Sequence, residues 1–272
     1  METKSIEQVR EILEHYYALC HRQVFIEDDP ISIPHRFSQK QDIEIMGFFA
    51  AILSWGQRLT IINNCLKLSE MMENRPFEFI RNHTQKDLIP LEHFVHRTFN
   101  STDLLGLIAF FKHYYAENDS LEDAFLKGMR ADDTDVGSGI QSFHDSVMQL
   151  ETTAQRTKKH LAAPSGKSTC KRINMYLRWM VRQDDCGIDF GLWQRIGAHR
   201  LICPLDVHVE RHARRLGLIS RKQTDWLTAL ELTDHLREID PSDPVRFDFA
   251  LFGMGIMEKR EALSYPRGDS AL

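Results

Sequence analysis

The sequence predicts an all-α protein. Apolar residues recur at spacings of three and four along most of the 272 residues, which is the pattern of an amphipathic helix. Capping residues such as Ser5 precede several of these stretches. No alternating run of β-branched residues is long enough to predict a strand. The length is enough for one large domain or for two lobes.

Helical periodicity accounts for most of the first 151 residues. The helices that it predicts lie at 5–20, 45–53, 60–72, 76–82, 101–116, 121–130 and 140–151. Ser5 can cap the first of them, and Gly56 ends the second. The proline-containing stretch 27–41 and the acidic stretch 131–139 are predicted to be loops.

The clearest helix of the second half spans 171–182. Its apolar stripe consists of Ile173, Tyr176, Leu177, Met180 and Val181, and Lys171, Arg178 and Arg182 are predicted to lie together on the opposite side. Residues 184–203 show no periodicity, and another helix is predicted at 225–238. Asp243 and Pro244 predict the start of a last helix, 245–252, which Gly253 and Gly255 are expected to end.

Between these elements, the stretch 203–218 combines a carboxylate with basic residues. Asp206 follows Pro204 at the position of a helix N-cap or first turn, and Gly217 is a suitable C-terminal stop. One face of this helix carries Leu205, Val209, Ala213 and Leu216, and the other carries His208, Arg211, Arg214 and Arg215. An acid at the tip of a helix with a basic flank is typical of a site that acts on a polyanion.

The charge distribution favours the same class of partner. The net charge is −5, yet residues 156–222 contain 15 Lys and Arg against 5 Asp and Glu, a surplus of ten positive charges. A basic block inside an acidic chain is the electrostatic pattern of a nucleic-acid-binding surface. The five cysteines are scattered without a CxxC pair, which predicts reduced thiols in a cytoplasmic protein rather than a metal site. No apolar run is long enough for a membrane span, and the charged start does not resemble a secretory signal.

Two segments carry a resemblance to a known family. Residues 204–209 read PLDVHV and are followed by ARRLGL at 213–218, which resembles the P-[VL]-D-[VT]-H-V…R-L-G-L segment of the helix-hairpin-helix DNA glycosylases. This superfamily includes endonuclease III and the 8-oxoguanine glycosylases, and the resemblance implies that Asp206 is the catalytic aspartate. Residues 171–177, KRINMYL, fit the family pattern K-x-x-N/D-x-x-L. Lys171 would then be the nucleophilic lysine.

The match is weaker in two other places. Residues 53–58, LSWGQR, resemble the family's L-S-x-Q turn with one inserted residue, so Gln57 would fill the gap left by a flipped base. The family's hairpin reads L-P-G-[VI]-G, whereas residues 163–170 read APSGKSTC and retain one glycine in a shifted register. The separation of 35 residues between Lys171 and Asp206 and the absence of four clustered cysteines resemble the archaeal 8-oxoguanine glycosylase branch.

The resemblance implies a two-lobed helix-hairpin-helix glycosylase fold. Residues 41–203 would form one lobe, and 1–40 would pack with 204–272 as the other. Such a protein would be a DNA repair glycosylase with lyase activity, acting as a monomer on double-stranded DNA with a damaged base and needing no metal and no cofactor. The residues expected to contact DNA are Gln57, Arg58, Ser165, Gly166, Lys167, Arg172, Arg178, Arg182, His208 and Arg211. Those available to stack on a flipped base are Trp55, Trp179, Phe190 and Trp193.

Three other functions are compatible with parts of the sequence. The altered hairpin favours a non-catalytic nucleic-acid-binding protein that keeps the glycosylase fold. Gly166-Lys167-Ser168-Thr169 resembles the end of a phosphate-binding P-loop, although position 161 is leucine where that motif needs glycine. His208 and His212 have the spacing of two metal ligands on one helix face, which would suit a metal hydrolase, but their neighbours are basic.

Overall fold

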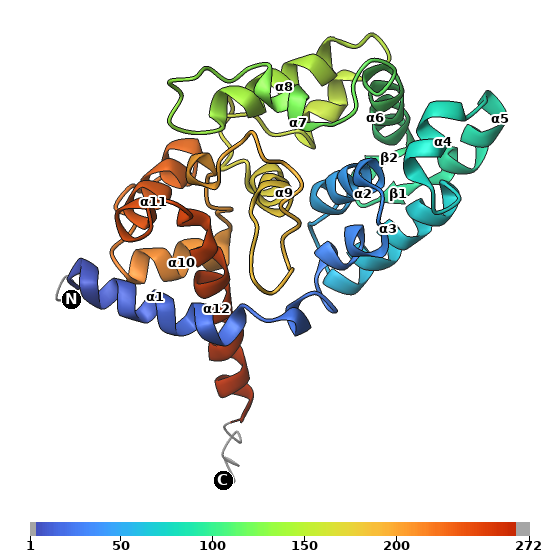
Figure 1. The fold of residues 1–272 in the computed structure, drawn as a ribbon. Helices are drawn as coiled ribbons and strands as arrows, with labels where there is room; N and C mark the ends of the chain where they lie inside the picture. The colour runs from blue at the N-terminus through green and yellow to red at the C-terminus, as the bar shows by residue number, and fades with distance from the viewer. Residues whose placement is uncertain (1–3, 265–272) are drawn as a thin grey trace.

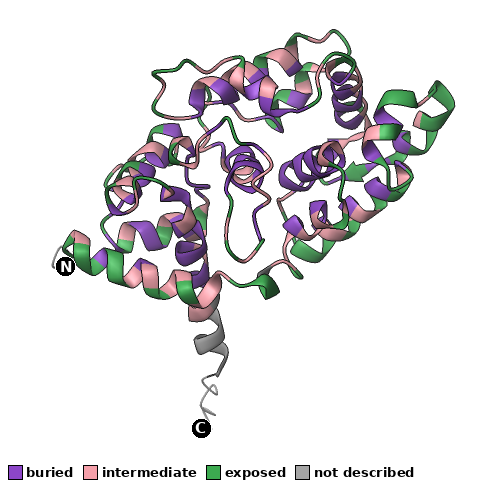
Figure 2. Cartoon of the chain, in the orientation of Figure 1, coloured by how far each residue is buried: buried purple, intermediate pink, exposed green. Residues whose placement is uncertain are grey.

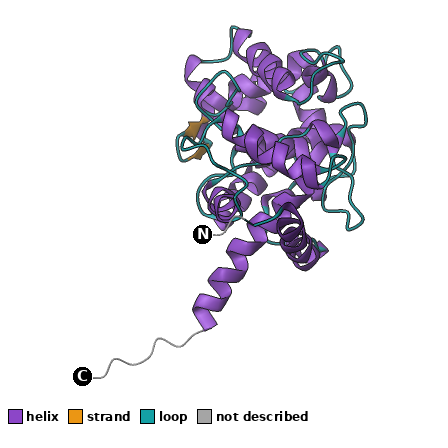
Figure 3. Cartoon of the chain, turned by 90° about the vertical axis from the view of Figure 1, so that its left-hand side faces the viewer, coloured by secondary structure: helices purple, strands orange, loops and turns teal. Residues whose placement is uncertain are grey.

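The computed structural model describes residues 4–264 and confirms the all-α prediction. Figure 3 shows helices joined by loops, with one short β-hairpin among the described residues, formed by β1 (Val95–His96) and β2 (Phe99–Asn100). None of the described helices is both long enough and apolar enough to cross a membrane.

The helices follow the predicted order closely. They are α1 (Ile6–Cys20), α2 (Lys40–Ile52), α3 (Arg58–Met71), α4 (Pro76–Asn82), α5 (Gln85–Leu88), α6 (Ser101–Tyr114), α7 (Glu122–Leu126), α8 (Gly137–Gln149), α9 (Lys171–Val181), α10 (Val207–Arg215), α11 (Trp226–Ile239) and α12 (Asp248–Ser264). Within residues 4–264, seven short 3₁₀ turns join them, at Gln23–Phe25, Pro30–Ser32, Pro34–Arg36, Ile89–His93, Gln155–Lys159, Ala198–Arg200 and Pro244–Phe247.

Helix α9 lies centrally, between α2 and its neighbours on one side and α10–α12 on the other (Figure 1). It packs on α2, while α1 and α10 both pack on α12. The turns at Pro30–Ser32 and Pro34–Arg36 pack on α2, although they fall in the segment assigned by sequence to the other lobe. The division into two lobes stays a prediction. The two ends of the predicted second lobe, residues 1–3 and 265–272, lie outside the described residues.

Local sequence accounts for the helices that frame the site. The side chain of Ser5 accepts a hydrogen bond from Gln8 N and completes a capping box at the start of α1. The apolar stripe predicted for α9 is buried, as the colouring of Figure 2 shows for most of this helix. After α10 the chain turns at Gly217, whose φ of +79° is readily available only to glycine.

The C-terminal helix differs from the prediction. Gly253 and Gly255 do not end it, because α12 continues from Asp248 to Ser264. A Cβ atom on Gly253 would overlap with Sγ of Cys20, and one on Gly255 would lie 3.3 Å from Nε2 of His212. These glycines therefore allow α1 and α10 to approach α12 closely, which is a packing role that helical periodicity does not reveal.

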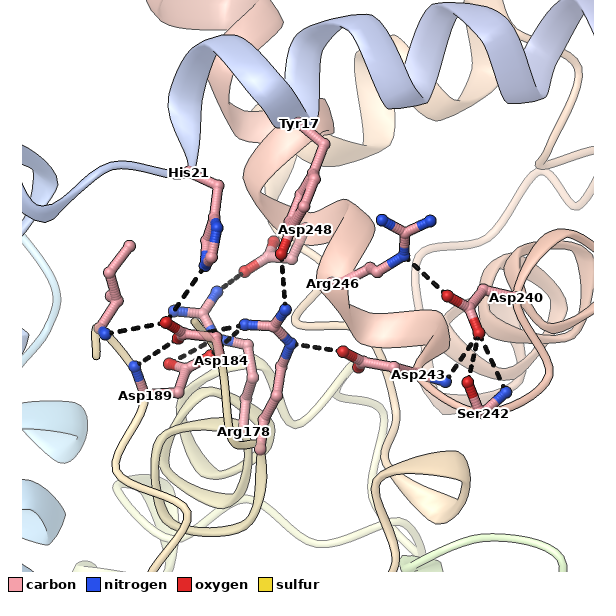
Figure 4. Close-up of polar contacts among 12 residues, drawn as sticks. Tyr17, His21, Arg178, Asp184, Asp189, Asp240, Ser242, Asp243, Arg246 and Asp248 are labelled. Atoms are coloured by element: carbon pink, nitrogen blue, oxygen red, sulfur yellow. Dashed lines mark hydrogen bonds and ion pairs between the residues drawn. The ribbon is translucent and has the colours of Figure 1, made fainter. Parts of the chain in front are cut away.

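Arg178 and Arg182 were predicted to contact DNA, and this prediction is wrong. Their exposed fractions are 4% and 3%. Arg178 pairs with Asp189 (Nε–Oδ1 3.3 Å) and with Asp248, while Arg182 pairs with Asp243 (Nε–Oδ2 2.7 Å) and with Asp189 (Nη1–Oδ2 3.1 Å). Figure 4 shows this cluster where α9, the loop that follows it and the start of α12 meet. The arginines hold these segments together instead of facing solvent.

Removing one arginine of this cluster should destabilise the fold strongly. Arg178→Met leaves Asp248 without its buried partner and leaves Asp189 with Arg182 alone, and breaking a buried pair in this way costs about 3–5 kcal/mol. Arg211→Met is the control, because the side chain of Arg211 is 50% exposed beside Glu258 and exposed pairs contribute about 0–1 kcal/mol. Urea unfolding measures both variants, and equal losses would contradict the structural role assigned to Arg178.

Candidate functional site

Lys171 and Asp206, the predicted catalytic pair, lie side by side. Lys171 is the first residue of α9 and Asp206 is the N-cap of α10. The distance from Lys171 Nζ to Asp206 Oδ2 is 3.6 Å, and the two side chains are 30% and 23% exposed. Two helix starts thus bring an amine and a carboxylate together at a place that solvent reaches.

The two oxygens of Asp206 do different things. Oδ1 accepts hydrogen bonds from the backbone N–H groups of His208 (2.9 Å) and Val209 (3.0 Å), which caps α10. This leaves Oδ2 facing Lys171. Because capping fixes the carboxylate plane, the oxygen directed at the amine is also fixed.

The chain just before Lys171 is held to the chain just before Asp206. The hydroxyl of Thr169 donates a hydrogen bond to the carbonyl of Leu205 (2.9 Å), and Asn174 Nδ2 donates to the carbonyl of Thr169 (3.1 Å). Cys170 then takes up the left-handed conformation, with φ at +54°, and turns the chain into α9. Burial raises the pKa of the Cys170 thiol to about 12, so this neighbour of Lys171 is not a nucleophilic thiolate at neutral pH.

A small pocket opens beside the pair. Its lining consists of Asp29, Lys171, Met175, Arg178, Asp206, Val209, Asp248, Phe249 and Phe252. The volume is about 50 Å³, well below the roughly 300–1,000 Å³ of a typical ligand site. A nucleobase therefore cannot enter unless the walls of the pocket move apart.

The aromatic residues expected to stack on a base do not line this pocket. Trp179 and Trp193 are core residues, with exposed fractions of 0% and 1%. The ring of Phe190 stacks on that of His35 at 4.2 Å, and Trp55 lies under the guanidinium of Arg97 at 4.8 Å. The aromatic walls are instead Phe249 and Phe252 of α12, which sequence analysis missed because their position depends on how α12 packs.

The predicted DNA-contacting turn at the start of α3 reaches the rim of the pocket. Gln57 and Arg58 are exposed, and Gly56 makes the turn before them with a φ of +114°. The guanidinium of Arg58 lies 6.0 Å from the ring centroid of Phe252. This turn is therefore placed to contact a ligand that enters beside Lys171.

Arg172 has a different role from the one predicted. Its Nη1 donates to the carbonyl of Ile52 (2.5 Å) and its Nη2 to the carbonyl of Lys159 (3.5 Å). Burial lowers the pKa of the guanidinium. Arg172 connects the start of α9 with the end of α2, so it positions Lys171 and does not present its charge to a phosphate.

The predicted hairpin lacks its first α-helix. A 3₁₀ turn, Gln155–Lys159, and an irregular segment precede residues 163–170. Ser165, Gly166 and Lys167 are exposed, but the amide of Ser165 donates to Gln141 Oε1 (3.2 Å) and that of Gly166 to the carbonyl of Ala163 (2.9 Å). These two amides are thus engaged within the protein. Within the described part of the chain, a 3₁₀ turn and not a strand lies before this segment, so the structure does not support the P-loop alternative.

Helix α10 carries the two predicted DNA contacts, His208 and Arg211. It also carries the histidine pair of the metal-hydrolase alternative, His208 and His212. Nη2 of Arg211 lies 3.6 Å from Oε2 of Glu258, while His208 is partly buried. His212 is fully buried, and burial lowers its pKa. Among the described residues, His208 and His212 belong to no group that could hold a metal ion, so nothing supports the hydrolase.

Much of the basic surplus is paired with carboxylates of the protein itself. The arginines within 4 Å of a carboxylate include Arg156, Arg178, Arg182, Arg195, Arg211, Arg214, Arg215 and Arg221. The exposed basic residues of the block include Lys158, Lys159, Lys167 and Lys222. The surface charge of this region is therefore lower than its composition indicates.

Asp248 is an additional titratable group in the pocket. Burial raises its pKa to about 6, although the guanidinium of Arg178 opposes the shift. Burial also raises the pKa of Asp29, across the same pocket. Sequence analysis missed both because each comes next to Lys171 only through tertiary packing.

The raised pKa of Asp248 makes stability depend on pH in a definite direction. The folded protein holds this proton more tightly than the unfolded chain does, so the contribution is present below about pH 4 and is lost as pH rises through about 6. The free energy of unfolding of the wild type should fall relative to Asp248→Asn by roughly 1–3 kcal/mol over this range. Urea unfolding at several pH values measures the difference, and parallel profiles would contradict the assignment.

These observations define a helical protein in which a lysine and an aspartate, each at a helix start, share one small pocket with two further carboxylates. The chain belongs to the DUF2400 family, described as a protein of unknown function, which it matches over residues 29–257. No curated protein and no solved structure matches the chain.

Proposed function

We propose that this protein is a DNA glycosylase with associated lyase activity. The observation that carries the proposal is the 3.6 Å contact between Lys171 Nζ and Asp206 Oδ2 at the edge of a pocket. An amine and a carboxylate held together are the two groups that nucleophilic displacement of a base from a sugar requires.

In the proposed reaction, the amine of Lys171 attacks C1′ of the deoxyribose, and the bond from C1′ to the base breaks. The carboxylate of Asp206 first accepts the proton that the ammonium of Lys171 must lose, and the resulting acid returns this proton to the nitrogen of the departing base. The regenerated carboxylate stabilises the positive charge on the sugar. The adduct amine then gives a proton to the ring oxygen as the bond from C1′ to that oxygen breaks, which leaves an imine between Lys171 and C1′. The small volume of the pocket means that base flipping has to be coupled to its opening.

The exposed residues near the pair would make the DNA contacts. Gln57 and Arg58 lie on the turn that reaches Phe252, where a plug for the emptied stack is needed. Lys167 is exposed in the hairpin segment, where it can meet a phosphate. Arg172, Arg178 and Arg182 are left out of this proposal because the protein itself occupies their guanidinium groups.

Trapping with borohydride tests the nucleophile. An imine on Lys171 would be reduced to a stable protein–DNA adduct on an abasic or lesion-containing duplex, and Lys171→Gln should abolish the adduct. Lys167→Gln is the matched control: it removes the same charge from an exposed position and should lower affinity while the adduct still forms. An adduct that depends on Lys167 and survives Lys171→Gln would overturn the assignment.

Asp206→Asn tests the carboxylate separately from the cap. The amide oxygen can still accept the hydrogen bonds from His208 and Val209, so α10 should keep its start. Loss of the charge should slow base excision by a factor on the order of 10²–10⁴. Single-turnover excision assays give the rate, and circular dichroism verifies the fold. An unchanged excision rate would remove Asp206 from the reaction.

The second candidate function is a non-catalytic nucleic-acid-binding protein. The closed pocket and the engaged amides of the hairpin favour it. Tight duplex binding with neither adduct nor excision on a panel of lesions would decide for this alternative.

A further inference from the structure

A second cluster of chemically competent side chains lies next to the arginine network and contains none of the residues that line the pocket. It consists of His21, at the C-terminal end of α1, and Asp184 and Cys186, in the loop after α9. Their ligand atoms all lie within 4.8 Å of one another. A histidine nitrogen, a carboxylate oxygen and a thiol are the ligand types that zinc takes in proteins.

The imidazole of His21 points to a ligand. Its side chain is 7% exposed, and Nε2 is buried without a well-formed hydrogen bond to any described residue. The nearest acidic atom, Asp184 Oδ1, is 3.4 Å away, a contact drawn in Figure 4. Two such atoms bound to one zinc ion at about 2.0–2.2 Å would be roughly 3.3–3.6 Å apart. The separation matches the edge of a coordination tetrahedron and is longer than most hydrogen bonds, although the two groups also attract each other as an ion pair.

The surrounding charge points to a cation as well. The two guanidinium groups of Arg178 and Arg182 face four carboxylates, those of Asp184, Asp189, Asp243 and Asp248. Buried charges are costly unless they are balanced. A divalent ion between His21 and Asp184 would add positive charge next to one of these four carboxylates.

The loop that carries Asp184 and Cys186 is already ordered around the carboxylate. Asp184 Oδ1 accepts from the amides of Cys186 (2.8 Å) and Ile188 (3.1 Å), and Oδ2 accepts from the amide of Asp189 (2.8 Å). Such hydrogen bonds orient a ligating carboxylate. The thiol of Cys186 donates weakly to the carbonyl of His21, with an S···O distance of 3.5 Å. It is partly exposed, so a small rotation can bring Sγ toward the other two ligands.

We infer that His21, Asp184 and Cys186 form a binding site for a zinc-like divalent ion, with a fourth position open to water. On binding, the thiol of Cys186 gives its proton to solvent and the sulfur coordinates as a thiolate. The ion would connect the end of α1 with the loop after α9, so its role is to hold these segments together. This inference is independent of the proposed glycosylase activity.

Cobalt titration of the metal-stripped full-length protein tests the site. Co²⁺ should bind one-to-one with tetrahedral d–d bands and a thiolate-to-cobalt charge-transfer band. Cys186→Ser should remove the charge-transfer band and weaken Zn²⁺ binding by a factor on the order of 100 or more. Cys20→Ser is the matched control, because Cys20 is a partly buried thiol next to His21 but outside the ligand group, and it should leave both bands intact.

Thermal unfolding gives a readout that does not depend on colour. Zn²⁺ should raise the unfolding midpoint of the wild type and of Cys20→Ser, and should leave those of Cys186→Ser and His21→Gln unchanged. The inference is overturned if Co²⁺ produces no bands, or if the bands survive Cys186→Ser. It is equally overturned if NMR shows His21 protonated at neutral pH with no response to Zn²⁺, since a proton then supplies the missing charge.

Discussion

The buried charge cluster around Arg178 and Arg182 is the constraint on which the position of α9 depends. Unpaired charges in a protein interior cost several kcal/mol each, so the loop after α9 and the start of α12 must bring their carboxylates to these arginines. Lys171 precedes Arg178 by seven residues, or about two helical turns, and lies on nearly the same face. The pairing that satisfies Arg178 therefore also directs Lys171 into the pocket that both residues line.

The other half of the site is built from capping and backbone contacts. Asp206 uses one oxygen to start α10 and the other to face Lys171. The bond from Thr169 to the carbonyl of Leu205 holds the two helix starts together, and Arg172 fixes α9 to the end of α2. The distance and orientation of Lys171 and Asp206 are thus set by groups that also stabilise the fold. Both residues stand at helix starts, and a site on helices is held more precisely than one on loops.

What sequence analysis predicted correctly depends on short-range physics. The stripe of α9, the capping role of Asp206 and the stop at Gly217 each involve residues within one or two turns. What it missed depends on partners far along the chain. Arg182 pairs with Asp243, 61 positions away, and position 253 must be glycine because the side chain of Cys20 leaves no room for a Cβ atom there. Composition counted the arginines as surface charge because it contains no information about where their counterions lie.

The pairing of arginines with the protein's own carboxylates affects how the proposed enzyme would bind DNA. If few cations remain to meet phosphates, the salt-dependent part of DNA affinity is small, since each phosphate contact contributes separately to it. Opening the pocket costs further free energy, which lowers the apparent affinity of any nucleotide that must enter it. Intact duplex would then be held weakly. A damaged base that unstacks at a low free-energy cost would offset the free energy needed to open the pocket. The enzyme would then recognise a lesion by how easily its base leaves the duplex, more than by attraction to the phosphate backbone.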